Sequence, residues 1–318
     1  MADLRSRFVE TGTLRLHLLE AGPEDAPTVV LLHGFPEFSE SWRDVMHRLA
    51  DAGFHAIAPD LRGYGESDKP ERGYDLDTLA RDVAGLIERV TPRARAHLVG
   101  HDWGGAIAYH VAAMHPERVQ TLSVVNAPHP RAMLRELRHP RQLLRSWYML
   151  FFQIPALPEW LLTRRQGVAV SEMIRRASVD ESRLPPERLR LFAEAFTRPD
   201  VARCALAYYR QSARNVLEGL RGTRPFPRIQ APFRLIWGLK DVALGPELTR
   251  GLEPFFEHPP EVDYLPDTGH FAPLEAPDLV ATSILTPLQA WTPAAQAARD
   301  MMPAHPAGEA AREHFVEE

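Results

Sequence analysis

Apolar and polar positions follow two alternating periods along most of the chain. Short runs of almost only apolar residues recur, and such a run predicts a strand that is buried on both faces. Between these runs, apolar residues recur at helical spacing. The runs cover residues 28–32, 55–58, 96–99, 121–125, 233–237 and 262–265, and an alternating segment over 13–20 precedes them. Strands that alternate with helices predict an α/β protein with a mostly parallel sheet and helices on both faces.

The alternation breaks between residues 131 and 222. Helix-like stretches follow one another there, with prolines between them and no convincing strand. We interpret residues 131–222 as a helical cap domain inserted into a core that consists of residues 1–130 and 223–293. Residues 294–318 are rich in Ala, Pro and Glu and weakly patterned, which predicts a loosely ordered C-terminal tail.

Composition and charge exclude some classes of protein. A hydrophobic fraction of 45% over 318 residues predicts a folded chain with a buried core. The net charge of -5 leaves no basic field that would hold a polyanion, so we expect no nucleic-acid partner. Residues 131–145 are locally rich in Arg, but leucines alternate with these arginines, which favours a solvated amphipathic face.

The cysteine count and the N-terminus indicate where the protein is located in the cell, and the histidine spacing indicates whether it binds a metal. A single cysteine, Cys204, excludes an intrachain disulfide and indicates a reducing compartment. The N-terminus lacks the apolar run of a signal peptide, and no stretch approaches the roughly 18 apolar residues of a membrane span. We therefore expect a cytoplasmic monomer or homodimer without stable membrane association. The 14 histidines show no helical pair in ligand spacing, so we predict no metal and no other cofactor.

The segment Gly100-His101-Asp102-Trp103-Gly104 stands directly after a buried strand and directly before a helix. A sharp turn in this context strains its central residue and requires small residues on both sides. It would expose the carboxylate of Asp102 above the sheet edge, beside the positive end of the following helix. We predict that Asp102 is a nucleophile and not an ordinary helix cap.

Further candidate residues follow other predicted strands. Asp241 comes after the strand at 233–237, and His270 comes after the last strand. The chain order nucleophile, acid, histidine is the order that this kind of fold uses for its triad. His33-Gly34-Phe35-Pro36 ends the strand at 28–32, where the N–H groups of Phe35 and Trp103 would form an oxyanion hole.

Together these motifs resemble the epoxide hydrolase branch of the α/β-hydrolases. The matching segments are His33-Gly34-Phe35-Pro36-Glu37, Asp60-Leu61-Arg62-Gly63-Tyr64-Gly65-Glu66-Ser67, Gly100-His101-Asp102-Trp103-Gly104-Gly105, Trp237-Gly238-Leu239-Lys240-Asp241 and Gly269-His270-Phe271. The resemblance covers about residues 5–285 and implies the α/β-hydrolase fold, an eight-stranded, mostly parallel sheet with a helical cap. It is specific for the branch with an aspartate nucleophile, and haloalkane dehalogenases share several of these motifs.

A carboxylate nucleophile indicates the class of bond attacked. It is ionised at neutral pH without a base and suits attack on an sp3 carbon, which argues against an esterase or lipase. Attack would give an alkyl ester of Asp102. His270, oriented by Asp241, would then deprotonate the water that hydrolyses this ester, while the Phe35 and Trp103 amides hold the oxyanion.

The leaving group decides between an epoxide and a halide. Epoxide opening develops an alkoxide, for which a phenol of pKa about 10 is a suitable acid. The resemblance implies two cap tyrosines in this role, and the matching segments assign them to Tyr148 and Tyr209, with Tyr208 as the alternative for the second. Aromatic and loop residues nearby are candidates to bind a small hydrophobic epoxide: His33, Pro36, Trp147, Phe151 and Phe152.

Two other functions stay open at this point. A haloalkane or haloacid dehalogenase would use the same nucleophile, but it would need N–H donors around a halide. Trp103 could be one of them, whereas Phe35 offers no side-chain donor. A fluoroacetate-type dehalogenase would be expected to have Arg in place of Trp103. A non-catalytic small-molecule-binding module would be free to lose one of the three catalytic residues, and this chain keeps all three. The sequence favours a hydrolase acting on the ether bond of an epoxide.

Overall fold

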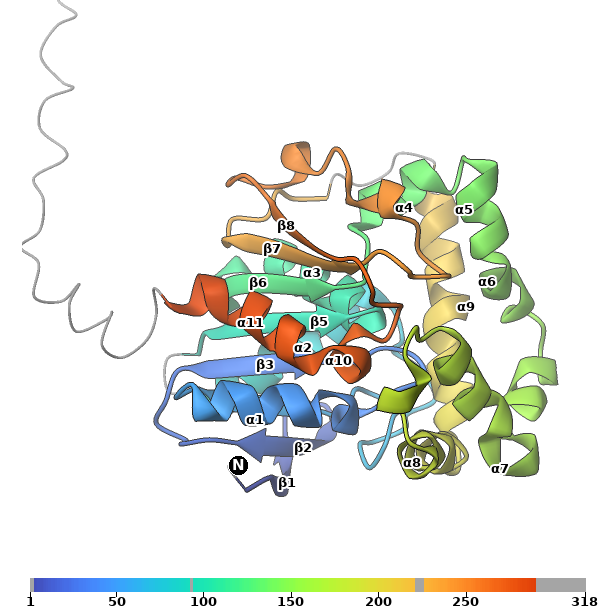
Figure 1. The fold of residues 1–318 in the computed structure, drawn as a ribbon, viewed down its shortest axis with the longest axis horizontal. Coiled ribbons are helices and arrows are strands. Elements are labelled where there is room, and N and C mark those ends of the chain that lie inside the picture. Colours follow the sequence, from blue (N-terminus) through green and yellow to red (C-terminus); the bar gives the residue numbers. More distant parts are fainter. Residues whose placement is uncertain (1–2, 92–93, 221–225, 290–318) are drawn as a thin grey trace, which may run out of the picture.

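The computed structural model describes residues 3–91, 94–220 and 226–289 (Figure 1). Its centre is an eight-stranded sheet with the order β1-β2-β4-β3-β5-β6-β7-β8. The strands are β1 Arg5–Glu10, β2 Arg15–Ala21, β3 Thr28–Leu32, β4 His55–Pro59, β5 Ala96–His101, β6 Val119–Val125, β7 Phe233–Gly238 and β8 Glu261–Leu265. β2 pairs antiparallel with β1 and β4, and all the other pairs are parallel. This arrangement confirms the predicted eight-stranded, mostly parallel sheet.

Helices cover both faces of the sheet. The helices of the core are α1 Arg43–Asp51, α2 Leu76–Val90, α3 Trp103–Met114, α10 Ala272–Glu275 and α11 Pro277–Leu288. α1 and α11 pack on one face, and α2 and α3 pack on the other (Figure 1). The 3-10 helices are η1 Ser39–Trp42, η2 Pro116–Arg118, η3 Glu181–Arg183, η4 Pro246–Thr249 and η5 Glu253–Phe255.

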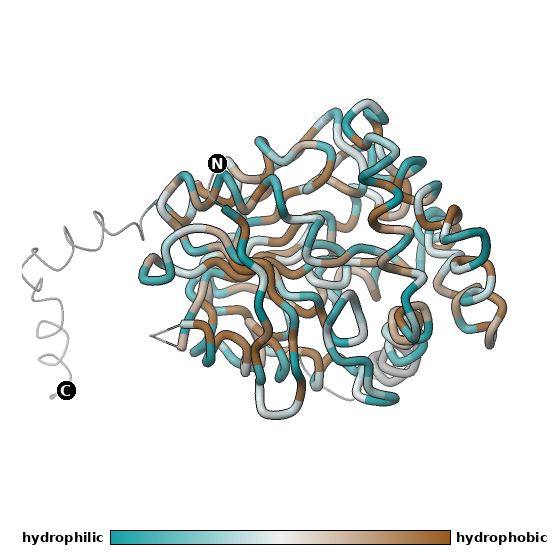
Figure 2. Tube along the Cα trace, turned by 90° about the horizontal axis from the view of Figure 1, so that it is seen from below, coloured by the Kyte–Doolittle hydropathy of each residue, from teal (hydrophilic) through white to brown (hydrophobic). Residues whose placement is uncertain are grey.

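The uninterrupted apolar run of β3 follows from this layering. Successive side chains of a strand point to opposite faces. Val29 and Leu31 join the hydrophobic cluster beneath α1 and α11, while Val30 and Leu32 join the cluster beneath α2 and α3. Because both faces of the strand are buried, each of residues 29–32 needs an apolar side chain. Figure 2 shows the apolar strands gathered in the middle of the molecule.

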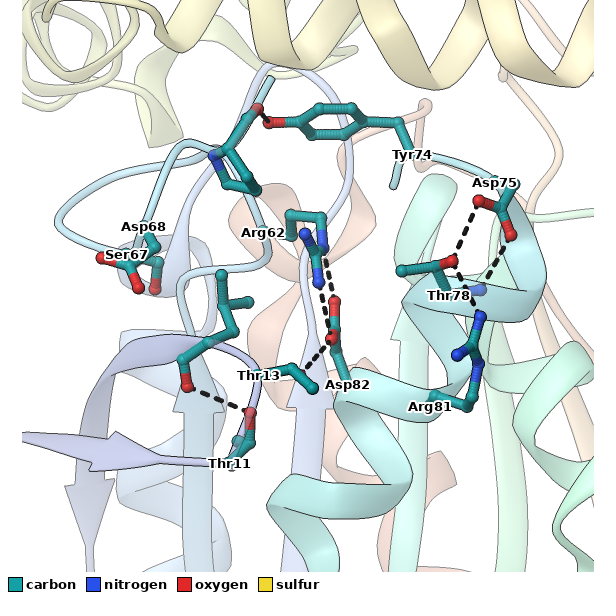
Figure 3. Close-up of polar contacts among 12 residues, drawn as sticks. Thr11, Thr13, Arg62, Ser67, Asp68, Tyr74, Asp75, Thr78, Arg81 and Asp82 are labelled. Carbon is teal, nitrogen blue, oxygen red and sulfur yellow. Dashed lines mark hydrogen bonds and ion pairs between the residues drawn. The ribbon is translucent and has the colours of Figure 1, made fainter. Parts of the chain in front are cut away.

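α2 shows how local sequence sets the limits of a core helix. Asp75 precedes the helix, and its carboxylate accepts the backbone N–H of Thr78 at 2.9 Å, which satisfies one of the open donors of the first turn (Figure 3). Apolar residues then recur at helical spacing and are buried against the sheet; they are Leu79, Val83, Leu86, Ile87 and Val90. Capping and periodicity thus specify the helix together.

Six helices form an insertion between β6 and β7. They are α4 Pro130–Glu136, α5 Pro140–Arg145, α6 Trp147–Phe151, α7 Leu157–Arg176, α8 Pro186–Phe196 and α9 Val201–Leu220. Figure 1 shows them stacked beyond one end of the sheet. The predicted domain boundaries remain a prediction, and the predicted tail over 294–318 lies outside the described residues. Within the described ranges, no helix combines the length and the apolar character needed to cross a membrane.

Candidate active site

Asp102 occupies a strained turn between β5 and α3. Its backbone has φ 48° and ψ -117°, a positive φ that side-chain-bearing residues rarely adopt. The flanking glycines make the turn sterically allowed. A Cβ on Gly100 would lie 2.3 Å from the carbonyl oxygen of Gly104, and a Cβ on Gly104 would lie 2.2 Å from the carbonyl oxygen of Leu32. The turn therefore needs glycine at both positions, and it lifts Asp102 from the end of the strand.

One oxygen of the Asp102 carboxylate is held by the loop after β3. The backbone N–H of Phe35 donates to Oδ1 of Asp102 at 2.9 Å. Trp103, the other residue of the predicted oxyanion hole, begins α3, so its amide belongs to the open first turn of that helix. The Phe35–Pro36 peptide bond is cis. The loop thus brings a backbone donor to the place where negative charge would develop on this carboxyl group.

His270 lies between the two aspartates. Its Nδ1 is 2.7 Å from Oδ2 of Asp241, and its Nε2 is 3.7 Å from Oδ2 of Asp102. Burial alone would lower the pKa of His270, but the charge and hydrogen bond of Asp241 and the charge of Asp102 outweigh burial and raise the pKa to about 9. The structure therefore brings the three predicted triad residues together.

Asp241 is fixed by donors from three directions. The backbone N–H groups of Ala243 and Leu244 donate to its Oδ1 at 2.8 and 2.9 Å. Oδ2, which faces His270, also accepts the side-chain amide of Asn126 at 2.8 Å. Burial would raise the pKa of Asp241, but the charge and hydrogen bond of His270, together with these donors, hold it below its usual value. The carboxylate stays ionised next to His270.

Asn126 is a site residue that the sequence reasoning missed. It is fully buried directly after β6, with φ 41°, and its side-chain oxygen accepts the N–H of Gly238 at 3.1 Å. Asn126 thus joins the ends of β6 and β7 and aims its amide at Asp241. A polar residue directly after the apolar run 121–125 was the available signal, because carboxyl ends of neighbouring parallel strands meet at one sheet edge.

Glu37 and His101 form a second missed feature, a fully buried pair behind the triad. Nδ1 of His101 is 2.7 Å from Oε2 of Glu37, and its Nε2 is 2.9 Å from the carbonyl oxygen of His270. Oε2 of Glu37 also accepts the N–H of Gly34 at 3.1 Å. Although burial opposes ionisation of Glu37, the charge of His101 lowers the pKa of this carboxyl group. The pair therefore links the loop after β3, the end of β5 and the loop that carries His270.

Tyr148 and Tyr209 reach the same cavity as Asp102, from α6 and α9. Their ring centroids are 6.0 Å apart, and the ring of Tyr209 packs edge-on against Trp103 at 5.0 Å. Burial, followed by the charge of Asp102, raises the pKa of both phenols. Both hydroxyl groups therefore keep their protons at neutral pH and remain hydrogen-bond donors.

Tyr208, the alternative to Tyr209, points elsewhere. Its side chain is fully buried, and its hydroxyl donates to the carbonyl oxygen of Arg62 at 2.7 Å. Arg62 itself is fixed by two hydrogen bonds to Asp82, at 2.6 and 2.9 Å (Figure 3). Tyr208 thus anchors α9 of the cap to the core, and this placement favours Tyr209 as the second cavity tyrosine.

The cavity above Asp102 has a volume of about 190 Å³ and a largely apolar lining. The lining comes from α2, α3, α4, α6, α9 and nearby loops: Leu76, Asp102, Trp103, Ala106, Pro128, Pro130, Met133, Leu134, Tyr148, Met149, Tyr209, Ser212 and Leu244. Its aliphatic part was not predicted, because an apolar residue in a helix carries no sign of whether it faces a cavity or a neighbouring helix.

The five candidate substrate-binding residues lie outside this lining. The ring of His33 braces the loop after β4, since its Nε2 accepts the N–H of Leu61 at 3.0 Å. Pro36 is buried in the cis-proline loop, and Phe151 is half-buried in α6. Phe152 packs behind the site, with its ring centroid 4.9 Å from that of Tyr209, whereas Trp147 is 62% exposed on the outer side of α6. Their assignment stays a prediction.

The described residues contain no group of three His, Cys, Asp or Glu side chains arranged to hold a metal ion. The two aspartates of the site are instead paired with His270 and with N–H donors. The arrangement offers a carboxylate at an open cavity, an imidazole held by a second carboxylate, a backbone donor and two phenol donors.

Comparisons with known proteins agree with this geometry. A model of the alpha/beta hydrolase fold family matches residues 27–277. AB hydrolase superfamily protein YfhM of Bacillus subtilis is 36% identical over 290 residues, which cover 90% of this chain and 98% of that protein. Epoxide hydrolase 4 of Mus musculus is 33% identical over 283 residues, with 86% and 76% covered. An epoxide hydrolase from Bacillus megaterium, solved with an inhibitor, has a TM-score of 0.79 at 28% identity and covers 89% of this chain and 100% of its own.

These similarities confirm the predicted fold class, the expectation of a hydrolase and the resemblance to epoxide hydrolases. The family match takes in both parts of the core and the inserted helices between them. The chain belongs to the alpha/beta hydrolase fold family.

Proposed function

We propose that this protein is an epoxide hydrolase that converts a small hydrophobic epoxide and water to a vicinal diol. The observation that carries the proposal is the shared cavity, in which the carboxylate of Asp102 and the phenols of Tyr148 and Tyr209 meet. A nucleophile and two acids at one apolar cavity match the needs of epoxide opening, in which a C–O bond breaks while a proton reaches the departing oxygen.

In the first step, Asp102 attacks a ring carbon of the epoxide. Oδ1 accepts the N–H of Phe35, which makes it the future carbonyl oxygen, while Oδ2 forms the new bond to carbon. The C–O bond of the epoxide breaks, and the alkoxide takes the proton of Tyr148 or Tyr209. The result is a hydroxyalkyl ester of Asp102 and a tyrosinate. Because an alkoxide is more basic than a phenolate, the proton transfer is favourable.

In the second step, water hydrolyses the ester. His270 accepts a proton from water, and the hydroxide adds to the ester carbonyl carbon. The tetrahedral oxyanion is stabilised by the N–H groups of Phe35 and Trp103. Its collapse breaks the bond to the ester oxygen, and the departing alkoxide takes the proton of the added hydroxyl group, which releases the diol and restores the carboxylate of Asp102. The proton held by His270 returns to the tyrosinate. Asp241 stabilises the imidazolium throughout, which fits its 2.7 Å contact with Nδ1.

The charge of Asp102 couples the two steps. The Asp102 carboxylate is one of the groups that raise the pKa of His270 in the free protein. Once Asp102 is esterified, that negative charge is gone, so the pKa of His270 falls, the ring releases its proton to solvent, and the neutral ring becomes available as a base. When the carboxylate of Asp102 is restored, the ring takes up a proton from solvent again. Formation of the ester therefore prepares the base that removes it.

The test is incubation with styrene oxide and a panel of aliphatic epoxides, scored for diol. We expect diol from at least one member. Turnover of no epoxide, with halide released from chlorinated or brominated alkanes, would instead make the protein a dehalogenase. Binding of an epoxide without consumption would indicate a non-catalytic binding module.

We also propose that the protein is cytoplasmic and works as a monomer or homodimer without nucleic acid. The single cysteine supports a reducing compartment, and it is buried in the described structure. The net charge of -5 supports the absence of a nucleic-acid partner.

A further inference from the structure

The outer side of the cap concentrates exposed apolar side chains. Of the sixteen large apolar side chains that are exposed in the described part of the chain, seven lie within residues 143–160. These seven define the outer cap surface: Leu143, Leu144, Trp147, Leu150, Ile154, Leu157 and Trp160. Leu144 is 74% exposed, Leu150 69% and Trp147 62%. Singly scattered apolar residues are normal on a protein surface, but a concentration of this kind marks a contact surface.

These residues follow one another along three consecutive helices of the cap. They lie in α5, in α6, in the turn at Ile154 and at the start of α7, and from Leu144 onward they recur every three or four residues. Figure 1 shows these elements along the edge of the cap that faces away from the sheet, with α9 between them and the core. Inward positions of the same segment are buried: Gln142 in α5, and Ser146 and Phe152 at the two ends of α6. Packing of the cap onto the core therefore does not explain the outward apolar residues.

Arginine side chains flank the outer cap surface at both ends. Residues 138–165 contain five arginines and one acidic residue, Glu159, in a chain whose net charge is -5. Glu159 is itself paired with Arg210 at 2.6 Å. Arg138 and Arg141 are exposed before the apolar stripe and make no ion pair with a described residue, and the guanidinium of Arg164 lies 4.7 Å from the ring of Trp160 at its other end.

We propose that the outer cap surface binds reversibly to anionic phospholipid membranes. Tryptophan and leucine side chains insert favourably at the boundary between headgroups and acyl chains, and arginines bind lipid phosphates. A second copy of the chain fits less well. A two-fold symmetric contact through this surface would bring the arginines of one copy against those of the other. Net positive charge around an apolar stripe is complementary to an anionic lipid surface.

Contact at this surface would bring the membrane close to the substrate cavity. α6 carries Trp147 and Leu150 on its outer side and Tyr148 and Met149 on the cavity side. An apolar epoxide partitions into membranes, so a protein bound there takes its substrate from the phase in which the substrate is concentrated. This last consequence rests on the proposed function, whereas membrane binding itself does not.

The test is co-sedimentation of the full chain with phosphatidylcholine vesicles that contain or lack phosphatidylglycerol, at low and high salt. We expect binding to the anionic vesicles, weak binding to the neutral ones, and loss of binding as salt rises. The variant Leu144→Ser/Leu150→Ser removes the two most exposed apolar side chains and is expected to abolish binding. Arg138→Gln/Arg141→Gln is expected to weaken it by more than tenfold, since each arginine near an anionic surface contributes about fivefold.

Matched controls make the result specific to the surface. Leu279→Ser changes a leucine that is 53% exposed on α11, and Arg72→Gln/Arg89→Gln removes two exposed arginines of the core; both should bind vesicles like the parent. The far-UV circular dichroism spectra and urea midpoints of the cap variants should match those of the parent, which shows that they fold whether or not the proposed function holds.

Three results would overturn the proposal. They are no binding by the parent, equal binding by Leu144→Ser/Leu150→Ser, and a dimer in analytical ultracentrifugation that this variant dissociates. Vesicle binding is measured without substrate, so a failure to form diol would contradict the proposed function and leave the membrane result standing.

Discussion

His270 has a charge state that depends on its neighbours. Burial disfavours its imidazolium, but Asp241 at 2.7 Å and Asp102 at 3.7 Å raise its pKa to about 9. In the free protein at neutral pH, His270 is therefore a cation between two carboxylates. A base that must accept a proton needs one of those charges to be removed first, and in the proposed mechanism ester formation on Asp102 would remove it.

Asp102→Asn reproduces this loss of charge without substrate. We predict that the pKa of His270 falls in this variant, because a group that stabilises the imidazolium has become neutral. An NMR titration of the imidazole signals, assigned with His270→Gln, measures the change. Asp278→Asn removes an exposed carboxylate on α11 and should leave the pKa unchanged. A pKa of His270 that is the same in Asp102→Asn and the parent would contradict the coupling.

A second prediction concerns the effects of replacing each of the three tyrosines by phenylalanine. Tyr148→Phe and Tyr209→Phe are each expected to lower kcat for epoxides by about a hundredfold, because each removes a phenol that can protonate the alkoxide. Tyr208→Phe should leave kcat near the parent value and cost about 1 kcal/mol in the free energy of unfolding, since it removes the hydrogen bond to Arg62. Steady-state kinetics and urea unfolding of the three variants measure both effects.

The assignment of the second cavity tyrosine depends on that comparison. If Tyr208→Phe lost as much activity as Tyr209→Phe, the acid would have to be reassigned. If both cavity variants kept full activity, protonation of the alkoxide by these phenols would be wrong.

At the scale of elements, the site is assembled from the ends of strands. β3 carries the Phe35 loop, β5 carries Asp102, β6 carries Asn126, and the loops after β7 and β8 carry Asp241 and His270. Parallel pairing brings these ends to one edge of the sheet, so residues far apart in the sequence become neighbours. The turn between β5 and α3 is tightly constrained, because a Cβ on Gly100 or on Gly104 would collide with backbone atoms.

Two glycine variants test that constraint. Gly100→Ala is expected to lower the free energy of unfolding by about 3 kcal/mol and to abolish activity, because its Cβ would lie 2.3 Å from the Gly104 carbonyl oxygen. Gly85→Ala lies inside α2, where its Cβ would make an ordinary contact of 3.6 Å with the carbonyl oxygen of Thr11. It should raise the free energy of unfolding by about 0.5–1 kcal/mol, because alanine favours a helix more than glycine does.

Urea unfolding of the two variants separates turn geometry from a general effect of replacing glycine. A Gly100→Ala variant as stable and active as the parent would show that the turn tolerates a side chain. A destabilised Gly85→Ala variant would show that α2 packs more tightly at this position than its contacts indicate.

At the scale of the whole molecule, the sequence predicted the architecture better than the cavity. Period-two and period-3.6 patterns are set by which face is buried, so they revealed the sheet, its flanking helices and the helical insertion. Motif spacing likewise predicted that Asp102, Asp241 and His270 would meet, because strand ends of a parallel sheet share one edge. The resemblance to epoxide hydrolases added the cap tyrosines.

The rest depends on packing that no local pattern records. Trp147 is exposed on the outer side of α6, whereas Met149 of the same helix lines the cavity, and the sequence did not distinguish the two sides. Asn126 and the Glu37–His101 pair were missed, because their partners are distant in the sequence and become neighbours only in the folded chain. α7 also contains a break at residues 164–167, where the backbone leaves the helical region, although its sequence continues a helical pattern.

In the proposed mechanism, catalysis passes through an ester on Asp102, which mass spectrometry of the His270→Gln variant with a good epoxide substrate would detect. The variant keeps the nucleophile and the tyrosines but lacks the base that activates water, so the ester should accumulate. We predict a protein whose mass has increased by that of one epoxide, with the adduct on the peptide that contains Asp102. The Asp102→Asn/His270→Gln variant should show no adduct. An unmodified His270→Gln protein after the parent has turned over the same substrate, or an adduct on another residue, would contradict the account.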